Sequence, residues 1–276
     1  MSLADRAFID TCRAILDRGT TVTDPKTRPH WPDGTTAYTR KLFGVVNRYD
    51  LKKEFPLLTV RPINFSAAVD EVLWIWQKKS SSVHDLKSHI WDAWADENGS
   101  IGKAYGYQMG VKHQYKEGWF DQTDRVLYDL KNNPCSRRIM TNIYNFADLH
   151  EMRLYPCAYS MTFNVTGKTL NAILNQRSQD MLAANAWNVA QYAALMMMLA
   201  QVSGLEAGEL VHVIADAHIY DRHVPIVEEL LTRACYPAPK VTLDPAVTDF
   251  YDFTPESFTV ADYKHGEKIG KFEVAI

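Results

Sequence analysis

The chain has 276 residues, of which 46% are hydrophobic and 23% are charged, and these proportions fit a folded soluble protein with a sizeable core. The formal net charge is −3 and no long basic tract occurs, which disfavours wholesale binding to DNA or RNA. The longest strongly apolar run, residues 192–200, is too short to span a bilayer, so we expect no membrane association.

The first half of the chain is predicted to be mainly helical. Residues 3–16 have helical apolar spacing and end near Gly19. A loop rich in Thr, Pro, Asp and Gly follows over residues 20–37 and carries Arg28. Residues 65–77 are predicted as a buried helix. Residues 121–131 are predicted as a more polar helix, ended by an Asn-Pro pair.

The second half adds predicted strands. Residues 138–144 form one, and residues 158–165 and 169–174 flank a Thr-Gly-Lys turn as a hairpin. Residues 187–202 are apolar on nearly every face, which predicts a central helix closed by Gly204. Residues 211–215 are predicted as a short buried strand that leads to His218.

These elements indicate one α+β domain over residues 1–276. Helices and strands alternate without a regular βαβ rhythm, and no repeat, low-complexity segment or Pro/Gly linker divides the chain. The four cysteines are widely spaced and form no Cys-x-x-Cys motif, so no metal site is expected. The N-terminus lacks the apolar segment of a signal peptide. We therefore expect free thiols in a reducing, cytoplasmic compartment.

A cysteine and several arginines are the first candidates for chemistry. Cys157 follows a proline where a loop enters a predicted strand, so its side chain can face a cavity. A lone cysteine is more often a small core residue, but nearby arginines would favour the nucleophilic thiolate. Arg177 ends an apolar strand, and with Ser178 it could hold an anion such as phosphate. Arg137 and Arg138 open another strand and are candidates for the same anion.

A buried carboxylate is the next candidate. Glu71 has apolar residues three and four positions away on both sides of its predicted helix, so it lies on an apolar face. Desolvation would raise its pKa and suit it to move protons. The equally weighted alternative is a structural carboxylate bonded to backbone or water.

Aromatic and polar side chains supply two further groups. Trp91-Asp92-x-Trp94 offers flat surface for a heterocycle, although most such pairs are core. Residues 216, 218 and 220 are Asp, His and Tyr, and alternation on a strand places them on one face. That face could bind a sugar hydroxyl, or it could be an exposed edge.

Taken together, these segments resemble the thymidylate synthase family, in particular its Bacillus and phage branch, over almost the whole chain. The motifs that carry the resemblance are Phe55-Pro56-Leu57-Leu58-Thr59, Glu71-Val72-Leu73-Trp74, Ile90-Trp91-Asp92-x-Trp94, Tyr105-Gly106, Ser136-Arg137-Arg138, Pro156-Cys157, Gln176-Arg177-Ser178-x-Asp180, Trp187-Asn188, His218-x-Tyr220 and Val274-Ala275-Ile276. The resemblance implies a large mixed β-sheet packed by helices, and a homodimer formed sheet to sheet.

The resemblance also implies a reaction, the reductive methylation of dUMP to dTMP. The donor of the carbon and the hydride would be 5,10-methylenetetrahydrofolate, which is released as dihydrofolate. Cys157 would attack C6 of the uracil and make C5 nucleophilic, while Asn188 would read the pyrimidine edge. Glu71, through water, and Tyr105 would move protons.

The family pattern assigns the other site residues by position. Phosphate would be held by Arg28, Arg177 and Ser178, with Arg137 and Arg138 donated by the partner subunit, and Gln176 is a further substrate-binding candidate. His218 and Tyr220 would bond the deoxyribose 3′-hydroxyl. Asp180 would face the folate with Trp91 and Trp94, and it is also expected to be a catalytic residue. Ile276 and its carboxylate would close over the site.

The chain departs from the family pattern after Asp180. Leu-Gly-x-Pro-Phe-Asn is usual there, and this chain has Ala183-Ala184-Asn185-Ala186-Trp187-Asn188. Loss of the Gly and Pro changes the backbone freedom of a loop expected to touch the folate.

The sequence also allows activities other than methylation. A hydroxymethylase of the same superfamily, acting on dUMP or dCMP, would quench the C5-methylene intermediate with water instead of hydride. Trp91, Leu154 and the Val-Ala-Ile tail favour methylation, and Asn188 favours uracil. A nucleotide-binding protein without turnover is the third hypothesis, and the intact Cys157 and Glu71 disfavour it. A cysteine hydrolase would leave the arginines without a role.

Overall fold

A seven-stranded mixed sheet organises the computed structural model, which describes residues 1–276 in full. The strand order is β1-β2-β9-β7-β6-β5, with β8 beside β9. The strands are β1 (Thr20–Val22), β2 (Thr39–Asp50), β5 (Met140–Asn142), β6 (Ala158–Thr166), β7 (Thr169–Gln176), β8 (Gln179–Asp180) and β9 (Glu206–Tyr220). β7 and β8 run parallel to β9, and the other neighbours are antiparallel.

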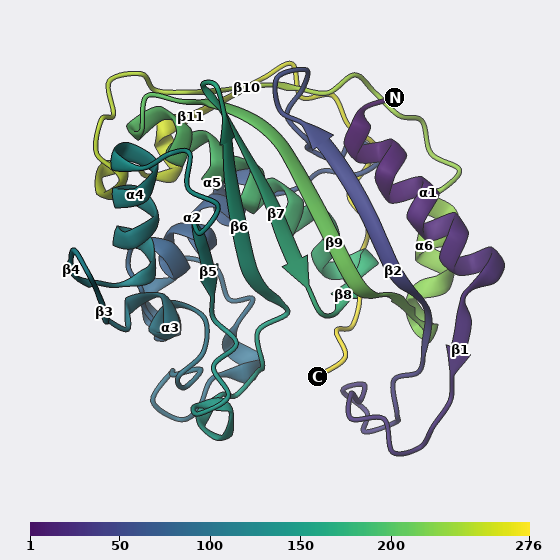
Figure 1. The fold of residues 1–276 in the computed structure, drawn as a ribbon. Coiled ribbons are helices and arrows are strands. Elements are labelled where there is room, and N and C mark those ends of the chain that lie inside the picture. Colours follow the sequence, from purple (N-terminus) through teal and green to yellow (C-terminus); the bar gives the residue numbers. More distant parts are fainter.

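The main helices cover one face of this sheet. α2 (Phe65–Trp76) and α5 (Ala186–Val202) pack together behind it, and α1 (Leu3–Arg18) runs along β2 (Figure 1). The smaller elements are α3 (Gly106–Gly110), α4 (Gln122–Asn132), α6 (Val224–Leu230) and two hairpins, β3 (His113–Tyr115) with β4 (Gly118–Phe120) and β10 (Lys240–Leu243) with β11 (Phe258–Ala261). The predicted α+β class is therefore confirmed.

The predicted central helix and hairpin are both present. α5 is buried on nearly every side, as its continuous apolar sequence requires, and Gly204 follows it with φ +66°. The β6–β7 hairpin turns at Gly167, whose φ of +62° is readily adopted only by glycine. This hairpin pairs Ala158 with Gln176. Cys157 and Arg177, which flank this pair, therefore lie side by side.

The opposite face of the sheet carries no helix (Figure 1). The strand register places Met140, Thr162, Ile173 and Val211 in one row across β5, β6, β7 and β9, so these side chains share a face. Met140 and Ile173 are among the exposed large hydrophobic side chains, and Phe43 on β2 is 91% exposed. A sheet that leaves apolar side chains bare on one face indicates a further contact surface.

Several strand predictions were wrong in extent. The sequence pattern missed β2, and it placed only residues 211–215 of β9. The region predicted as loop over residues 20–37 begins with β1, and the strand predicted over residues 138–144 covers only Met140–Asn142. β2 has one buried residue, Tyr49, and Gly44 interrupts it with φ +78°, so no alternating apolar pattern marks it.

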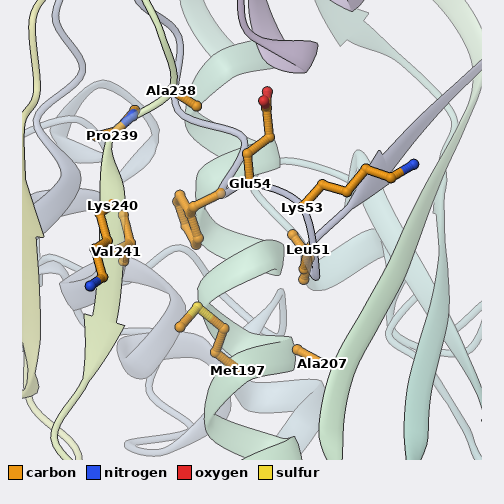
Figure 2. Close-up of a pocket in the computed structure, with 10 residues that line it drawn as sticks. Leu51, Lys53, Glu54, Met197, Ala207, Ala238, Pro239, Lys240 and Val241 are labelled. Atoms are coloured by element: carbon orange, nitrogen blue, oxygen red, sulfur yellow. The ribbon is translucent and has the colours of Figure 1, made fainter.

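A pocket of about 430 Å³ opens beside α5. Leu51, Met197, Ala207 and Val241 are among its lining residues (Figure 2). The charged end of Glu54 points away from its centre and accepts a hydrogen bond from the backbone of α1. None of the candidate site residues lines this pocket.

Candidate active site

The β6–β7 hairpin brings the candidate nucleophile beside an arginine. Cys157 directly precedes β6 and Arg177 directly follows β7, so the pairing of the two strands makes them neighbours. The Arg177 backbone N–H donates to the Cys157 carbonyl at 2.9 Å, and Arg177 Nη2 lies 3.7 Å from Cys157 Sγ. The thiol therefore faces a fixed positive charge.

Burial and charge act on this thiol in opposite directions. Burial raises the pKa of Cys157, whereas the Arg177 guanidinium, the Tyr105 hydroxyl and the charge of Arg28 all lower it. Arg28 itself is exposed on the segment between β1 and β2. The arginines thus lower the pKa of the thiol, as the sequence predicted. Burial has the larger effect, so the net pKa of the thiol lies above its ordinary value.

Arg177 is anchored by the backbone around Cys157. Its Nε donates to the Pro156 carbonyl at 3.0 Å, and its Nη2 donates to the Tyr155 carbonyl at 2.6 Å. Its Nη1 donates to no protein group, so the guanidinium keeps donors for an anion while its orientation is held.

Glu71 is buried on α2 between two tryptophans. Its Oε1 accepts from Trp91 Nε1 at 3.0 Å, and its Oε2 accepts from Trp187 Nε1. Burial raises the pKa of Glu71 to about 7, against the opposing effect of these hydrogen bonds. The partners are indoles, which neither of the two hypotheses from the sequence had anticipated.

Tyr105 links the thiol to the tryptophans. Its hydroxyl accepts from the Cys157 backbone N–H at 3.1 Å, and its ring lies 4.8 Å from that of Trp91. Tyr105 has φ +45°, a conformation that costs a non-glycine residue about 1–3 kcal/mol. The next residue must be glycine, because a Cβ at Gly106 would lie 2.1 Å from the Ser80 carbonyl oxygen. Burial raises the pKa of Tyr105 well above its ordinary value.

Asn188 lies in a network of amides. Its Oδ1 accepts from Gln176 Nε2 at 3.1 Å and from Gln179 Nε2 at 3.3 Å, while its Nδ2 donates to Gln191 Oε1 at 2.9 Å. Gln176 Oε1 in turn accepts from His212 Nε2 at 2.8 Å. Burial lowers the pKa of His212 to about 3, so this ring is neutral at physiological pH.

Sequence reasoning missed three members of this network: Gln179, Gln191 and His212. The available signal was a histidine on the core face of β9, between buried Leu210 and Ile214. A polar side chain at such a position must be hydrogen-bonded, and its partner is the motif residue Gln176. The network fixes which end of the Asn188 amide is the acceptor.

Asp180 caps the segment that departs from the family pattern. Its Oδ1 accepts from the backbone N–H groups of Leu182 and Ala183 at 2.9 and 3.1 Å. The segment expected to be a loop is instead a π-helical stretch, Met181–Asn185, that continues into α5. Alanines replace the glycine and proline that would interrupt a helix, which accounts for this difference.

The polar residues at the end of β9 share a face, as their alternation predicts. His218 Nδ1 bonds Asp216 Oδ1 at 2.8 Å, and Lys41 pairs with the other oxygen of Asp216 at 2.7 Å. The His218 and Tyr220 rings lie 5.1 Å apart. Tyr220 also packs on Trp31, at 5.7 Å. Asp216 therefore orients the His218 ring.

Two further candidates are Ile276 at the C-terminus and the aromatic residue Trp94. Ile276 pairs with His30 through two backbone hydrogen bonds of 3.0 and 2.9 Å, which fix the C-terminus to the segment between β1 and β2. Trp94 packs on Trp91, with ring centroids 5.7 Å apart, and its buried Nε1 has no hydrogen-bond partner.

Two candidate arginines are not brought to the thiol by their own chain. Arg137 and Arg138 precede β5 and are exposed. Neither side chain makes a hydrogen bond or an ion pair. The structure also has no group of three or more His, Cys, Asp or Glu placed to hold a metal ion, and no helix long and apolar enough to cross a membrane.

Comparison with known proteins assigns this arrangement to a family. The family model described as thymidylate synthase matches residues 6–276. The chain belongs to the thymidylate synthase family. Thymidylate synthase from Bacillus licheniformis is 41% identical and thymidylate synthase 1 from Bacillus subtilis is 40% identical, each over the full length of both chains. The solved structure of thermostable thymidylate synthase A from Bacillus subtilis superposes with a TM-score of 0.93, at 39% identity and 99% coverage of both chains.

The resemblance seen in the motifs is therefore confirmed, and so is the thymidylate synthase fold. The departure after Asp180 does not remove the chain from this family, because the match continues through that segment to residue 276.

Proposed function

We propose that the protein converts dUMP to dTMP, taking one carbon and a hydride from 5,10-methylenetetrahydrofolate and releasing dihydrofolate. One observation carries the proposal: a continuous chain of contacts joins Arg177 to Glu71. Arg177 contacts Cys157, Cys157 contacts Tyr105, Tyr105 contacts Trp91, and Trp91 contacts Glu71. An anion-binding group, a nucleophile and a buried carboxylate thus lie in one site. The full-length relatives named thymidylate synthase support the same reaction.

Cys157 is the nucleophile in this account. Its sulfur adds to C6 of the uracil, and the electron pair moves to C5, which becomes able to attack the one-carbon unit. Arg177 stabilises the thiolate from 3.7 Å and, with Ser178 and Arg28, holds the phosphate. A bound phosphate positions the ring over the sulfur, so that addition becomes an intramolecular event.

Asn188 reads the pyrimidine. Uracil presents an N–H donor at N3 beside a carbonyl acceptor at O4, so the amide meets it with one acceptor and one donor. The Gln176 and Gln191 contacts fix those two ends of Asn188 before the ring arrives. Asp216 holds His218 in position to bond, with Tyr220, the 3′-hydroxyl.

Proton transfer falls to Glu71 and Tyr105. A carboxyl with a pKa near 7 exchanges protons readily at physiological pH, and Glu71 meets that condition because it is buried. We assign it the transfer to and from the uracil carbonyl through water. The Tyr105 hydroxyl lies at the Cys157 end of the site, where the C5 proton must leave.

The aromatic pair forms the folate side of the site. Trp91 and Trp94 supply flat aromatic surface for a fused heterocycle. We also assign the Asp180 carboxylate, which caps the start of the π-helical stretch, to the folate side of the site. Ile276 closes the site from the C-terminus and excludes water.

We infer a homodimer formed through the uncovered face of the sheet. That face exposes Met140, Ile173 and Phe43, and Arg137 and Arg138 beside it have no partner in their own chain. A two-fold contact would carry both arginines to the phosphate in the partner's site. The four unpaired cysteines further support action in a reducing cytoplasm.

Hybrid dimers test the shared site. Cys157→Ser subunits and Arg137→Ala/Arg138→Ala subunits are each expected to form impaired homodimers. Mixed dimers regain one complete site, made of Cys157 from one subunit and the arginines from the other. Equal mixing with free exchange is expected to give about one quarter of wild-type activity, because half of the dimers are hybrids. Activity no higher than that of the separate variants would contradict donation across the interface.

Product identification tests the reaction. The protein is incubated with dUMP and methylenetetrahydrofolate, and nucleotide and folate products are followed together by mass spectrometry. We expect dTMP and dihydrofolate in equal amounts. Hydroxymethyl-dUMP with tetrahydrofolate would show a hydroxymethylase instead, and dUMP binding without product would show a binding protein.

A further inference from the structure

Trp187 holds the second oxygen of the buried carboxylate. Its indole Nε1 donates to Glu71 Oε2, while Trp91 Nε1 donates to Oε1 at 3.0 Å. Trp91 comes from the segment after α2, and Trp187 comes from the first turn of α5. Two indoles from separate elements therefore fix both oxygens and the plane of the carboxylate.

We propose that Trp187 is a positioning residue, whose indole N–H orients the Glu71 carboxylate and stabilises its ionised form. The inference rests on the proposed function for the role of Glu71 in proton transfer. Its physical basis is that a hydrogen bond to a charged acceptor inside a protein is stronger than one between neutral groups. The contact joins residues 116 apart in sequence, so only the packing of α5 on α2 creates it.

Apolar packing alone does not account for Trp187. A phenyl ring could pack against the core at this position but could not donate a hydrogen bond. Trp187 is only partly buried, and it packs against the edge of the hydrophobic core. The feature that tryptophan adds here is the N–H, and that N–H meets the carboxylate.

The other groups around Glu71 do not replace this donor. Asp70, on the same helix, carries a charge of the same sign and favours the protonated form of Glu71. Tyr192 on α5 also lies within electrostatic reach of Glu71. Trp91 and Gln191 act in the same direction as Trp187 and favour the ionised form. Loss of Trp187 would leave one oxygen without its indole partner in a buried site.

Indole NMR resonances report this contact without turnover. In the wild-type protein labelled with ¹⁵N-tryptophan, the Trp187 and Trp91 Nε1–H resonances are expected to shift together with pH as Glu71 titrates. Glu71→Gln should abolish the shift. In Trp187→Phe, the Trp91 resonance is expected to titrate with a midpoint about one pH unit higher, because the ionised carboxylate has lost a donor.

Trp119→Phe is the matched control, since Trp119 is an exposed indole on β4 that takes part in no hydrogen bond with Glu71. It should remove one resonance and leave the midpoint unchanged. A Trp187 resonance that does not respond to pH in the wild-type protein would overturn the proposal even if Trp187→Phe failed to fold. So would an unchanged Trp91 midpoint in Trp187→Phe.

The two proposals fail separately. An unresponsive Trp187 resonance in a protein that makes dTMP would refute the positioning role alone. The expected titration in a protein that makes no dTMP would support the contact and refute the proposed reaction. In an active protein, the Glu71-dependent limb of the kcat/KM profile should move with the NMR midpoint in Trp187→Phe and stay in place in Trp119→Phe.

Discussion

Replacing Cys157 by serine is expected to abolish dTMP formation, by on the order of 10⁴-fold or more, and to leave dUMP binding largely unchanged. A serine hydroxyl is a far weaker nucleophile toward C6 than a thiolate. The Arg177 guanidinium stays in place because its partners are the backbone carbonyls of Tyr155 and Pro156, which the substitution leaves intact. Steady-state turnover and calorimetric dUMP binding measure the two effects separately.

Cys235→Ser is the control for this experiment, since Cys235 is a partly buried free thiol outside the site. It should retain wild-type turnover. If Cys157→Ser lost dUMP binding and thermal stability together with activity, Cys157 would be a structural residue, and the assignment of the nucleophile would be wrong.

Asn188→Asp is expected to change which base the enzyme accepts. Gln176 and Gln179 would continue to donate to one oxygen of the new side chain, and the second oxygen would replace the Asn188 Nδ2 donor. A protonatable carboxyl can both accept from the cytosine amino group and donate to N3. Hydrogen-bond mismatches of about 1–3 kcal/mol predict a change of roughly 5- to 160-fold in the dUMP/dCMP ratio of kcat/KM.

The base preference is measured by competition between dUMP and dCMP in one reaction. Asn164→Asp makes the same chemical change at an exposed position on β6 and should keep the wild-type preference. An unchanged ratio for Asn188→Asp would show that Asn188 does not read the base.

The sequence supported those predictions that depend on local pattern. α2 and α5 were predictable because their apolar residues are continuous enough to require burial, and the β6–β7 hairpin was predictable from its Gly167 turn. That hairpin places Cys157 beside Arg177, so the centre of the site followed from local signals.

The parts that were missed depend on contacts between distant segments. β2 shows no strong pattern because one of its faces is bare and Gly44 interrupts it. His212 acts on Asn188 only through Gln176, and the Trp187–Glu71 contact exists only once α5 packs on α2. The π-helical stretch after Asp180 was also missed, because the loss of glycine and proline predicted only a change in the freedom of a loop.

Transfer of deuterium tests the central claim, reductive methylation, most directly. The enzyme is supplied with dUMP and with methylenetetrahydrofolate that carries deuterium at the transferable hydride position of its reduced ring, and the nucleotide product is analysed by mass spectrometry. The account predicts dTMP with one deuterium in its new methyl group, formed in step with dihydrofolate. A product without deuterium, or one that carries a hydroxyl from water at that carbon, would contradict it.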